Sequence, residues 1–217
     1  MPPTLMQARA ESLRSRPSTP LITDCTQGRV ELSHATFDNW VCKTVNLLRL
    51  ELDVEPGQVI SVDLPLHWMT AVWLVSIWET GAHVSLGTTS ADLLVGTAAG
   101  ADVLVVPDAL GMAPAPSGIE AQAVFPADAR GMPDQLVFPA VQPGGMVGGP
   151  AASELAAQSL VQSGQWGLEP GGRLATDLEV VDMIGVLAAI ASPISVGAGV
   201  VYGTDVDQER PTARATR

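Results

Sequence analysis

Apolar positions along the chain recur either with the period of a helix or in short runs typical of buried strands. Between Phe37 and Leu48 they follow the i, i+3, i+4, i+7 spacing of one buried helix face, and Ser33 precedes this stretch as a suitable N-cap. Lys43 and Asn46 fall mainly on the opposite face, so we expect both to be solvated. The same reasoning predicts helices over 5–14, 34–48, 66–80 and 151–162.

Strands are expected between these helices. The run from Val59 to Leu64 is mostly apolar and β-branched, which suits a buried strand, and a Pro-Gly turn precedes it. A helix and another strand follow with short links, and this order describes a right-handed β-α-β unit. Strands are predicted over 21–24 and 29–33, which flank a hairpin turn at Gly28, and over 59–64, 82–87 and 103–106.

Residues 107–150 have a different composition. They hold eight of the 17 prolines and seven of the 21 glycines, which indicates an irregular connection. One short helix is expected within it, near 119–124.

Part of the pattern occurs twice. A Glu-Pro-Gly turn before a strand returns 114 positions later, and a Gly-Ala pair opening a second strand returns after 116 positions. We interpret this as internal duplication of a β-α-β subdomain; two independent units with similar turn chemistry are the alternative. The matching residues are Glu55–Gly57 with Glu169–Gly171, Asp63–Leu64 with Asp177–Leu178, Gly81–Ala82 with Gly197–Ala198, Val84 with Val200, and Gly87 with Gly203.

The stretch Leu32–Gly87 resembles the opening of the acyl-adenylate-forming superfamily, which includes acyl-CoA synthetases, luciferases and peptide-synthetase adenylation domains. Members carry a Ser-Tyr-x-Glu-Leu helix start, a Leu-rich helix, a Gly-x-x-x-Gly-Asp-x-Val turn and a Gly-Ala strand. Here His34 replaces the tyrosine, Thr36 the glutamate and Gln58 the aspartate. The resemblance covers about 150 residues and is weaker in the second half. The whole chain looks closest to small actinobacterial proteins distantly related to AMP-binding enzymes.

This resemblance implies an α/β fold of two similar β-α-β-type subdomains related by a pseudo-twofold axis, without the family's C-terminal domain. We therefore expect a single α/β domain over 1–205. It would contain a first subdomain over about 17–110, the Pro/Gly-rich connection over about 107–150, a second subdomain over about 151–205, and a disordered tail over 206–217.

The family's nucleotide loop, Ser/Thr-Gly-Thr-Thr-Gly-x-Pro-Lys, should fall at 143–153, where this chain reads PGGMVGGPAAS. No hydroxyl precedes Ser153 in that stretch and no lysine follows, although each charge-assisted hydrogen bond is worth roughly 1.5–3 kcal/mol. We expect a plain connection, with residual anion binding as the alternative. Only weak nucleotide-binding candidates remain: Gly144, Gly145, Gly148 and Gly149.

Other candidate chemistry is sparse. Tyr202–Asp207 looks like the family's Tyr-Gly-x-Thr-Glu motif, but Tyr202 belongs to the predicted Gly-Ala strand, so we interpret the match as coincidence. No Gly-x-Ser-x-Gly elbow occurs, and His34, His67 and His83 fall at two helix starts and a strand; we interpret each as structural. A Ser/His/Asp triad stays open as the alternative.

The net charge of the chain limits the classes of partner that it can bind. The net charge is −12 and Lys43 is the only lysine, so we expect neither nucleic acid nor membrane as a partner. Cys25 and Cys42 are expected to be reduced and structural, and no metal site is indicated. The N-terminus lacks a signal peptide's apolar core, which favours a cytoplasmic location. Trp73 lies off the Trp68–Trp78 helix face, so it is either core or an exposed anchor for a partner.

The leading hypothesis is a catalytically silent relative of AMP-binding enzymes, with no catalytic residue and no ATP or AMP cofactor. It would act as a binding or scaffold module for a protein partner, or by self-association into a homo-oligomer. The first alternative is a nucleotide- or acyl-binding enzyme fragment completed in trans by another chain. The second is a carrier of an unidentified small ligand between the subdomains.

Overall fold

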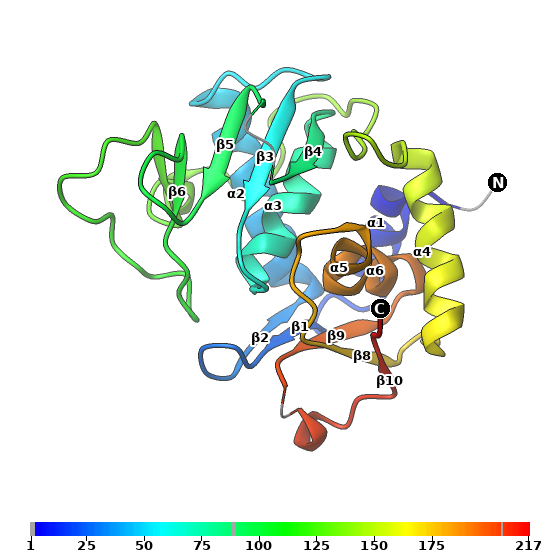
Figure 1. The fold of residues 1–217 in the computed structure, drawn as a ribbon. Coiled ribbons are helices and arrows are strands. Elements are labelled where there is room, and N and C mark those ends of the chain that lie inside the picture. Colours follow the sequence, from blue (N-terminus) through cyan, green and yellow to red (C-terminus); the bar gives the residue numbers. More distant parts are fainter. Residues whose placement is uncertain (1–2, 88–89, 205) are drawn as a thin grey trace. The chain divides into compact units, whose positions relative to one another are not determined.

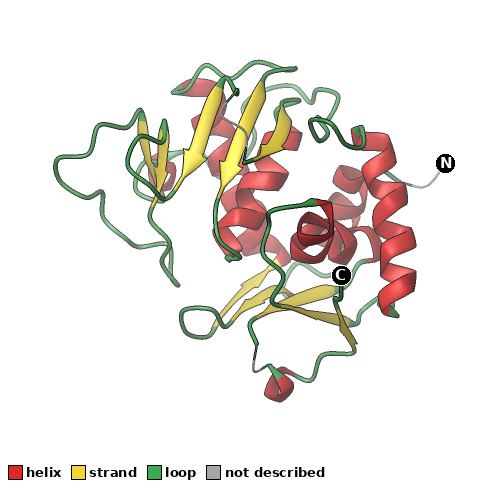
Figure 2. Cartoon of the chain, viewed as in Figure 1, coloured by secondary structure: helices red, strands yellow, loops and turns green. Residues whose placement is uncertain are grey.

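The computed structural model describes residues 3–87, 90–204 and 206–217 (Figure 1). They form two compact units, each an α/β structure with its own sheet (Figure 2). The first unit comprises 1–38, 66–68 and 150–217, and the second comprises 39–65 and 69–149.

The second unit contains a sheet of five parallel strands in the order β4-β3-β5-β6-β7. Helix α2 enters this unit from Asn39 onwards, and α3 lies almost wholly within it. The elements are α2 (His34–Leu50), β3 (Val59–Asp63), α3 (Trp68–Glu79), β4 (His83–Leu86), β5 (Leu93–Gly96), β6 (Val103–Val105), β7 (Ala123–Phe125) and the 3-10 turn η1 (Ala129–Gly131).

Aromatic side chains form much of this unit's core. Helix α3 is apolar nearly all round, which is typical of a helix buried on every side. The Trp73 ring packs edge-on against Phe125 with centroids 5.4 Å apart, and Trp40 of α2 lies 5.7 Å from the same ring. Trp73 is completely buried, so the exposed-anchor interpretation of this residue is wrong.

The expectation that Lys43 and Asn46 are solvated is also wrong. The Lys43 ammonium donates to the carbonyl oxygens of Arg130 and Met132, at 3.1 and 2.6 Å. The Asn46 amide is fully buried and donates to the carbonyl oxygens of Pro133 and Gln135. The connection therefore covers the polar face of α2, and these two side chains bind carbonyl groups that have no strand partner.

The connection departs from expectation at one further point. Residues 119–122 form no helix, and Ala123–Phe125 is strand β7, which pairs in parallel with β6. Ala, Val and Phe suit a buried strand, and both Ala123 and Phe125 are buried.

The first unit contains a five-stranded sheet in the order β10-β8-β9-β1-β2, parallel except for the β1–β2 hairpin. Helices α1, α4 and α6 pack on one another, and α6 also contacts β9. The elements are α1 (Leu5–Ser15), β1 (Pro20–Asp24), β2 (Val30–Ser33), α4 (Ala152–Trp166), β8 (Arg173–Thr176), α5 (Met183–Val186), the π-helical η2 (Leu187–Ala191), α6 (Ser192–Val196), β9 (Gly199–Tyr202), the 3-10 turn η3 (Asp207–Glu209) and β10 (Ala213–Arg214).

The hairpin changes the expected division of the chain. We assigned residues from 17 onwards to the first subdomain, but β1 pairs in parallel with β9, register Ile22 to Val200. The hairpin therefore completes the sheet that contains the second copy of the repeat. Sequence proximity to α2 concealed this pairing, because strand partners are set by edge hydrogen bonds rather than by distance along the chain.

The expected disordered tail, 206–217, is ordered. Strand β10 pairs in parallel with β8, and the Trp166 indole N–H donates to the Thr216 carbonyl at 3.1 Å. Glu209 accepts from the Arg29 guanidinium at 2.6 Å, and this contact lowers the pKa of the Glu209 carboxyl. The polar composition of the segment reflects an edge strand and ion pairs, not disorder.

The two copies of the repeat fold alike. Strand β3 pairs with β4 across α3, and β8 pairs with β9 across α5–α6, in matching registers. We call the turn pair Gly57/Gly81 the first corner and the pair Gly171/Gly197 the second corner. In each, the first glycine's N–H donates to the second glycine's carbonyl, at 2.9 and 3.0 Å. All four glycines have φ between +68° and +89°, which explains why glycine stands at each matched position.

Candidate functional site

The loop where a nucleotide site was considered is bound to the edge of the second unit's sheet. The Gly144 N–H donates to the Trp78 carbonyl at 2.9 Å, and the Gly145 N–H donates to His83 Nδ1 at 3.1 Å. The Val84 N–H donates to the Gly145 carbonyl, and Val147 donates back to Val84. These N–H groups already have acceptors within the protein, whereas a phosphate cradle requires N–H groups directed at the ligand.

Gly144 has a packing role. A Cβ atom at this position would lie 1.6 Å from the Ala82 carbonyl oxygen, a distance that no side chain tolerates. Gly148 and Gly149 are exposed; Gly148 adopts φ +65°, and the Gly149 N–H closes a turn onto the Met146 carbonyl. The Gly-rich composition is thus accounted for by close approach and by turn geometry.

At the start of α4, the helix that follows this loop, the partial positive charge of the helix dipole is not available to a ligand. The Ala151 N–H donates to the Glu154 carboxylate at 3.2 Å, and the Glu154 N–H donates to the Ala151 carbonyl at 2.9 Å. A carboxylate therefore occupies the positive end of the α4 dipole. This local charge opposes binding of a second anion at the start of α4.

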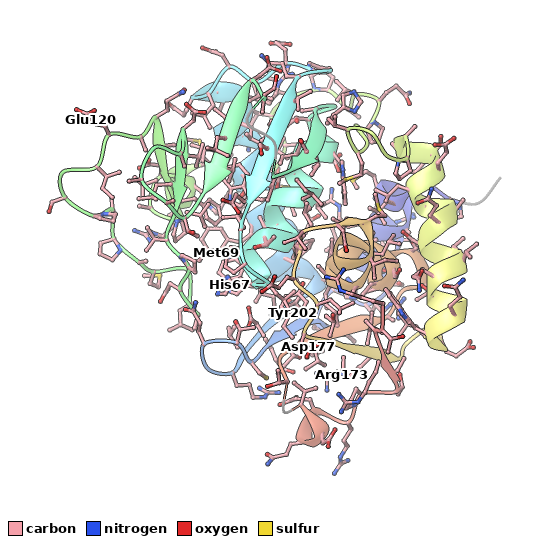
Figure 3. All side chains as sticks on the ribbon, in the orientation of Figure 1. His67, Met69, Glu120, Arg173, Asp177 and Tyr202 are labelled. Carbon is pink, nitrogen blue, oxygen red and sulfur yellow. The ribbon has the colours of Figure 1, made fainter. Side chains whose placement is uncertain are left out.

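A buried polar cluster lies in the first unit, at the end of β1. One Asp24 oxygen accepts from the Thr26 N–H and hydroxyl, and the other accepts from the Trp68 N–H at 2.8 Å. His67 Nε2 lies 3.8 Å from this second oxygen; Figure 3 labels His67. The donors to Asp24 come from a turn and a helix start, so the carboxylate joins β1 to the first turn of α3.

Tyr202, also labelled in Figure 3, is completely buried at the end of β9, the strand on which the sequence analysis placed it. Its hydroxyl donates to the Ala189 carbonyl at 2.6 Å. Burial, and then the Asp24 charge, raise the pKa of Tyr202 well above its usual value. The phenol stays protonated at neutral pH and connects β9 to the helix η2. Asp205, which lies within this motif match, is outside the described residues.

The remaining candidates are dispersed. His34 begins α2 and His83 lies on β4, so the three histidines lie at the positions that the sequence predicted. Cys25 and Cys42 form no disulfide with each other, and burial raises the pKa of Cys25. Within the described ranges no group of three or more His, Cys, Asp or Glu side chains is placed to hold a metal ion. No helix in that part of the chain is both long and apolar enough to cross a bilayer.

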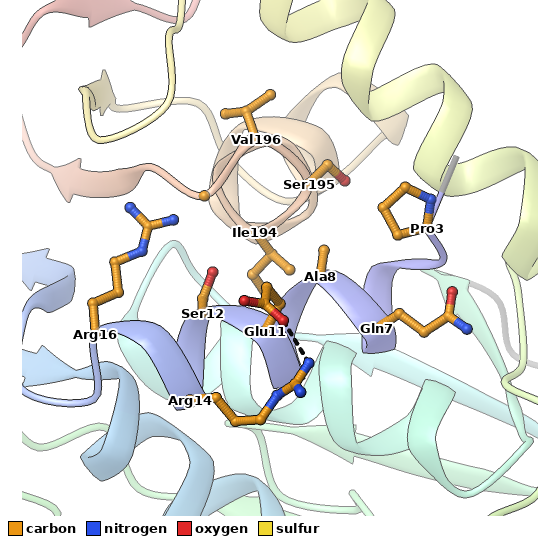
Figure 4. Close-up of a pocket in the computed structure, with 11 residues that line it drawn as sticks. Pro3, Gln7, Ala8, Glu11, Ser12, Arg14, Arg16, Ile194, Ser195 and Val196 are labelled. Atoms are coloured by element: carbon orange, nitrogen blue, oxygen red, sulfur yellow. Dashed lines mark hydrogen bonds and ion pairs between the residues drawn. The ribbon is translucent and has the colours of Figure 1, made fainter. Parts of the chain in front are cut away.

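Two hollows in the first unit were not anticipated from the sequence. One of about 400 Å3 lies between α1 and α6, and another of about 300 Å3 lies at the N-terminal ends of β8 and β9. Arg16 and Gly197 line both (Figure 4 shows the first). The signal available in the sequence was weak: an arginine just before Pro17, at the expected end of a helix.

Solved structures with a similar fold are adenylate-forming enzymes and their domains. The chain aligns with the N-terminal domain of FACL13 from Mycobacterium tuberculosis at TM-score 0.71 and 12% identity, covering 96% of this chain and 61% of that one. It aligns with the AMPPNP-bound nonribosomal peptide synthetase FmoA3 at TM-score 0.67 and 15% identity, covering 93% of this chain and 23% of that one. The fold is therefore that of adenylate-forming N-terminal domains, although the chain spans less than two thirds of either structure.

No family model matches the chain. A curated relative does: over 211 residues the chain is 32% identical to a TIGR03089 family protein of Mycobacterium tuberculosis, and the match covers 85% of each. At this identity and coverage the chain belongs to the TIGR03089 family.

Proposed function

We propose that this protein is a binding or scaffold module that keeps the adenylate-forming fold without forming adenylates. The observation that carries the proposal is the loop 143–149, where the N–H groups of Gly144, Gly145 and Val147 bind protein acceptors. Opening this loop to a triphosphate would break those bonds and separate it from β4. Each lost backbone bond costs roughly 1 kcal/mol.

A protein partner is supported by the outer face of α4. Ala157, Leu160, Val161 and Gly164 share this exposed face, and Glu154 is the only charged residue of the helix. Val161 is 65% exposed. An uncharged helix face with apolar and small residues is typical of helix–helix packing between proteins.

Self-association through this face is the form of the proposal that we favour. A net charge of −12 opposes the approach of two copies, so salt should strengthen association by screening the repulsion. Static light scattering coupled to gel filtration, from 50 mM to 1 M salt, measures the mass directly. A dimer fraction that increases with protein and salt concentration is expected, and a monomer under all conditions contradicts self-association.

Matched variants locate the surface. Val161→Glu places a charge on the α4 face, and Val137→Glu makes the same change at a 52% exposed position of the second unit. We expect Val161→Glu to abolish the dimer and Val137→Glu to leave it unchanged. If both variants lowered the dimer fraction equally, the loss would be due to the added net charge and not to the α4 face.

The lack of adenylation is tested separately. Isothermal titration with Mg-ATP, AMP and acyl-CoA should give no saturable binding below about 1 mM, a free energy of about −4 kcal/mol. Micromolar, magnesium-dependent ATP binding, or pyrophosphate release with a carboxylic acid, overturns the proposal. It would instead support the alternative of an enzyme fragment completed by another chain.

A further inference from the structure

The two corners differ in what lies next to their second glycine: backbone of the connection covers Gly81, whereas a hollow lies beside Gly197. At the first corner, Gly81 is covered by backbone: a Cβ there would lie 3.1 Å from the Gln142 carbonyl oxygen. At the second corner, no backbone covers Gly197 in this way, and the nearest group to its Cβ position is a guanidinium nitrogen of Arg16, at 2.1 Å. A hollow of about 300 Å3 remains beside it.

Among the residues that the structure describes, Arg16 is the charged group lining this hollow that has no partner. Across residues 3–87, 90–204 and 206–217 its guanidinium makes no hydrogen bond to protein and has no carboxylate within 4.0 Å. Two other arginines of the first unit differ: Arg14 pairs with Glu11 at 2.5 Å (Figure 4), and Arg29 pairs with Glu209. The chain has 23 acidic and 11 basic residues, so an arginine without an ion pair among the described residues is unusual. Its position in a hollow indicates a binding site for an anion.

His34 is a second, independent sign of a ligand. It lines the same hollow and is 5% exposed, yet in the described part of the chain its ring makes no hydrogen bond. Burial, and then the charge of Arg16, lower the pKa of His34 to about 4. The ring is therefore neutral at pH 7 and offers one N–H donor and one acceptor.

The charges around the hollow suit a monoanion. Arg16 and Arg173 contribute two positive charges and Glu31 one negative charge, so the lining carries a net charge of +1. Arg173 already donates to the Glu209 carbonyl and the Thr23 hydroxyl, both at 2.6 Å, and this leaves Arg16 as the available cation. The planar guanidinium fork matches the two oxygens of a carboxylate, whereas a dianionic phosphate would leave one charge uncompensated.

A second hollow next to the Arg16 side chain offers space for the part of a ligand beyond its anionic group. The hollow of about 400 Å3 between α1 and α6 shares Arg16 and Gly197 and is lined partly by Ala8, Ile194 and Val196 (Figure 4). The Ser195 hydroxyl borders it and makes no hydrogen bond with the described residues.

We propose that the second corner, built by Arg16, His34 and the Gly171/Gly197 turns, binds the carboxylate of a small organic acid. Arg16 holds the carboxylate in a two-point ion pair and His34 donates a hydrogen bond to it. This inference does not depend on the proposed lack of adenylation, because the site lies entirely within the first unit, whereas the 143–149 loop belongs to the second.

Titration with sodium acetate, pyruvate and benzoate, at constant ionic strength and pH 7, tests the proposal by NMR of the His34 ring. We expect saturable shifts with at least one carboxylate at a Kd of about 1 mM or tighter, and weaker shifts with chloride and inorganic phosphate. Absence of saturation by any of the three below 10 mM overturns the proposal. Phosphate binding tighter than every carboxylate overturns the assigned ligand class.

Two arginine variants distinguish binding at Arg16 from a general effect of the protein's net charge. Arg16→Gln should weaken carboxylate binding at least tenfold, while Arg214→Gln, which removes the same charge from a 52% exposed side chain on β10 that lines neither hollow, should change Kd less than twofold. Equal loss in both variants overturns the proposal. His34→Gln, which keeps a donor, should weaken binding by less than Arg16→Gln, and unchanged binding in both Arg16→Gln and His34→Gln also overturns it.

Discussion

The two corners of the repeat have the same backbone and different surroundings. Each has a glycine N–H bound to a glycine carbonyl, then a parallel strand pair in the same register. Around the first corner, the connection 141–146 packs against Gly81 and adds a bridge from Met146 to Val84. Around the second, the Arg16 side chain is the main cover. The two corners thus share one backbone geometry, but the first is covered by the connection, and the second borders a concave, positively charged surface.

This difference bears on where function should be sought. Resemblance to adenylate-forming enzymes directs attention to the Gly-rich loop, but that loop serves the first corner as structure. The second corner retains an arginine without a partner and a buried histidine without a hydrogen bond among the described residues. Unmet polar groups next to a hollow are a better guide to binding than glycine content.

The largest expected effect is at Gly144, which holds the connection against the first corner. Gly144→Ala places a Cβ 1.6 Å from the Ala82 carbonyl oxygen, so backbone must move. We expect a loss of at least 3 kcal/mol in the free energy of unfolding, measured by urea denaturation. Gly164→Ala, in α4 with open space around it, is the control and should be neutral or stabilising by up to about 1 kcal/mol. Normal stability of Gly144→Ala would remove the packing role and reopen a ligand role for the loop.

The next effect tests the edge of the second copy's sheet. Removing residues 211–217 deletes β10 and leaves the buried Trp166 indole N–H without the Thr216 carbonyl. We expect a loss of about 2 kcal/mol, or a Tm lower by about 5 °C, in calorimetry. Arg214→Ala alone removes an exposed ion pair with Asp207 and should cost less than about 0.5 kcal/mol. An unchanged Tm after the deletion would mean that the segment contributes no stability.

His34 gives the second corner a pH dependence. Its pKa is lowered to about 4 from 6.5, so between these values the unfolded chain binds more protons than the folded one. Stability is therefore retained above pH 6.5 and falls as the pH drops towards 4, with a loss of about 2 kcal/mol by pH 5. Urea denaturation of wild type and His34→Gln across pH 4–7.5 isolates this contribution, because the carboxylate contributions cancel in the difference. A difference independent of pH would contradict the lowered pKa.

The smallest effect compares the two corners directly. Both Gly81 and Gly197 have positive φ, so alanine at either costs about 1 kcal/mol of backbone strain. At Gly81 the added Cβ also meets the Gln142 carbonyl oxygen and Pro56, whereas at Gly197 it meets a guanidinium that can swing away. We expect Gly81→Ala to cost about 1 kcal/mol more than Gly197→Ala in urea denaturation. Equal costs would mean that the two corners are equally enclosed.

The sequence by itself determined the local elements and the repeat. Glycine at matched turns, β-branched runs and helical periodicity depend on interactions between residues close in the chain, so β3, β4, β9 and the principal helices appeared where they were predicted. The resemblance likewise gave the fold that the solved structures share. The α2 periodicity identified Phe37, Val41 and Leu48 as buried.

Only the tertiary structure decided which residues are covered and which are left exposed. It paired the hairpin with β9, ordered the tail along β8, and placed Lys43 and Asn46 against carbonyl groups of the connection. It also left the Arg16 guanidinium beside Gly197 with no hydrogen bond or ion pair to the described residues. These outcomes depend on contacts between residues at least 39 positions apart, such as Ala213 and Leu174, or on the absence of such contacts among the described residues. No local pattern of apolar and polar residues encodes them.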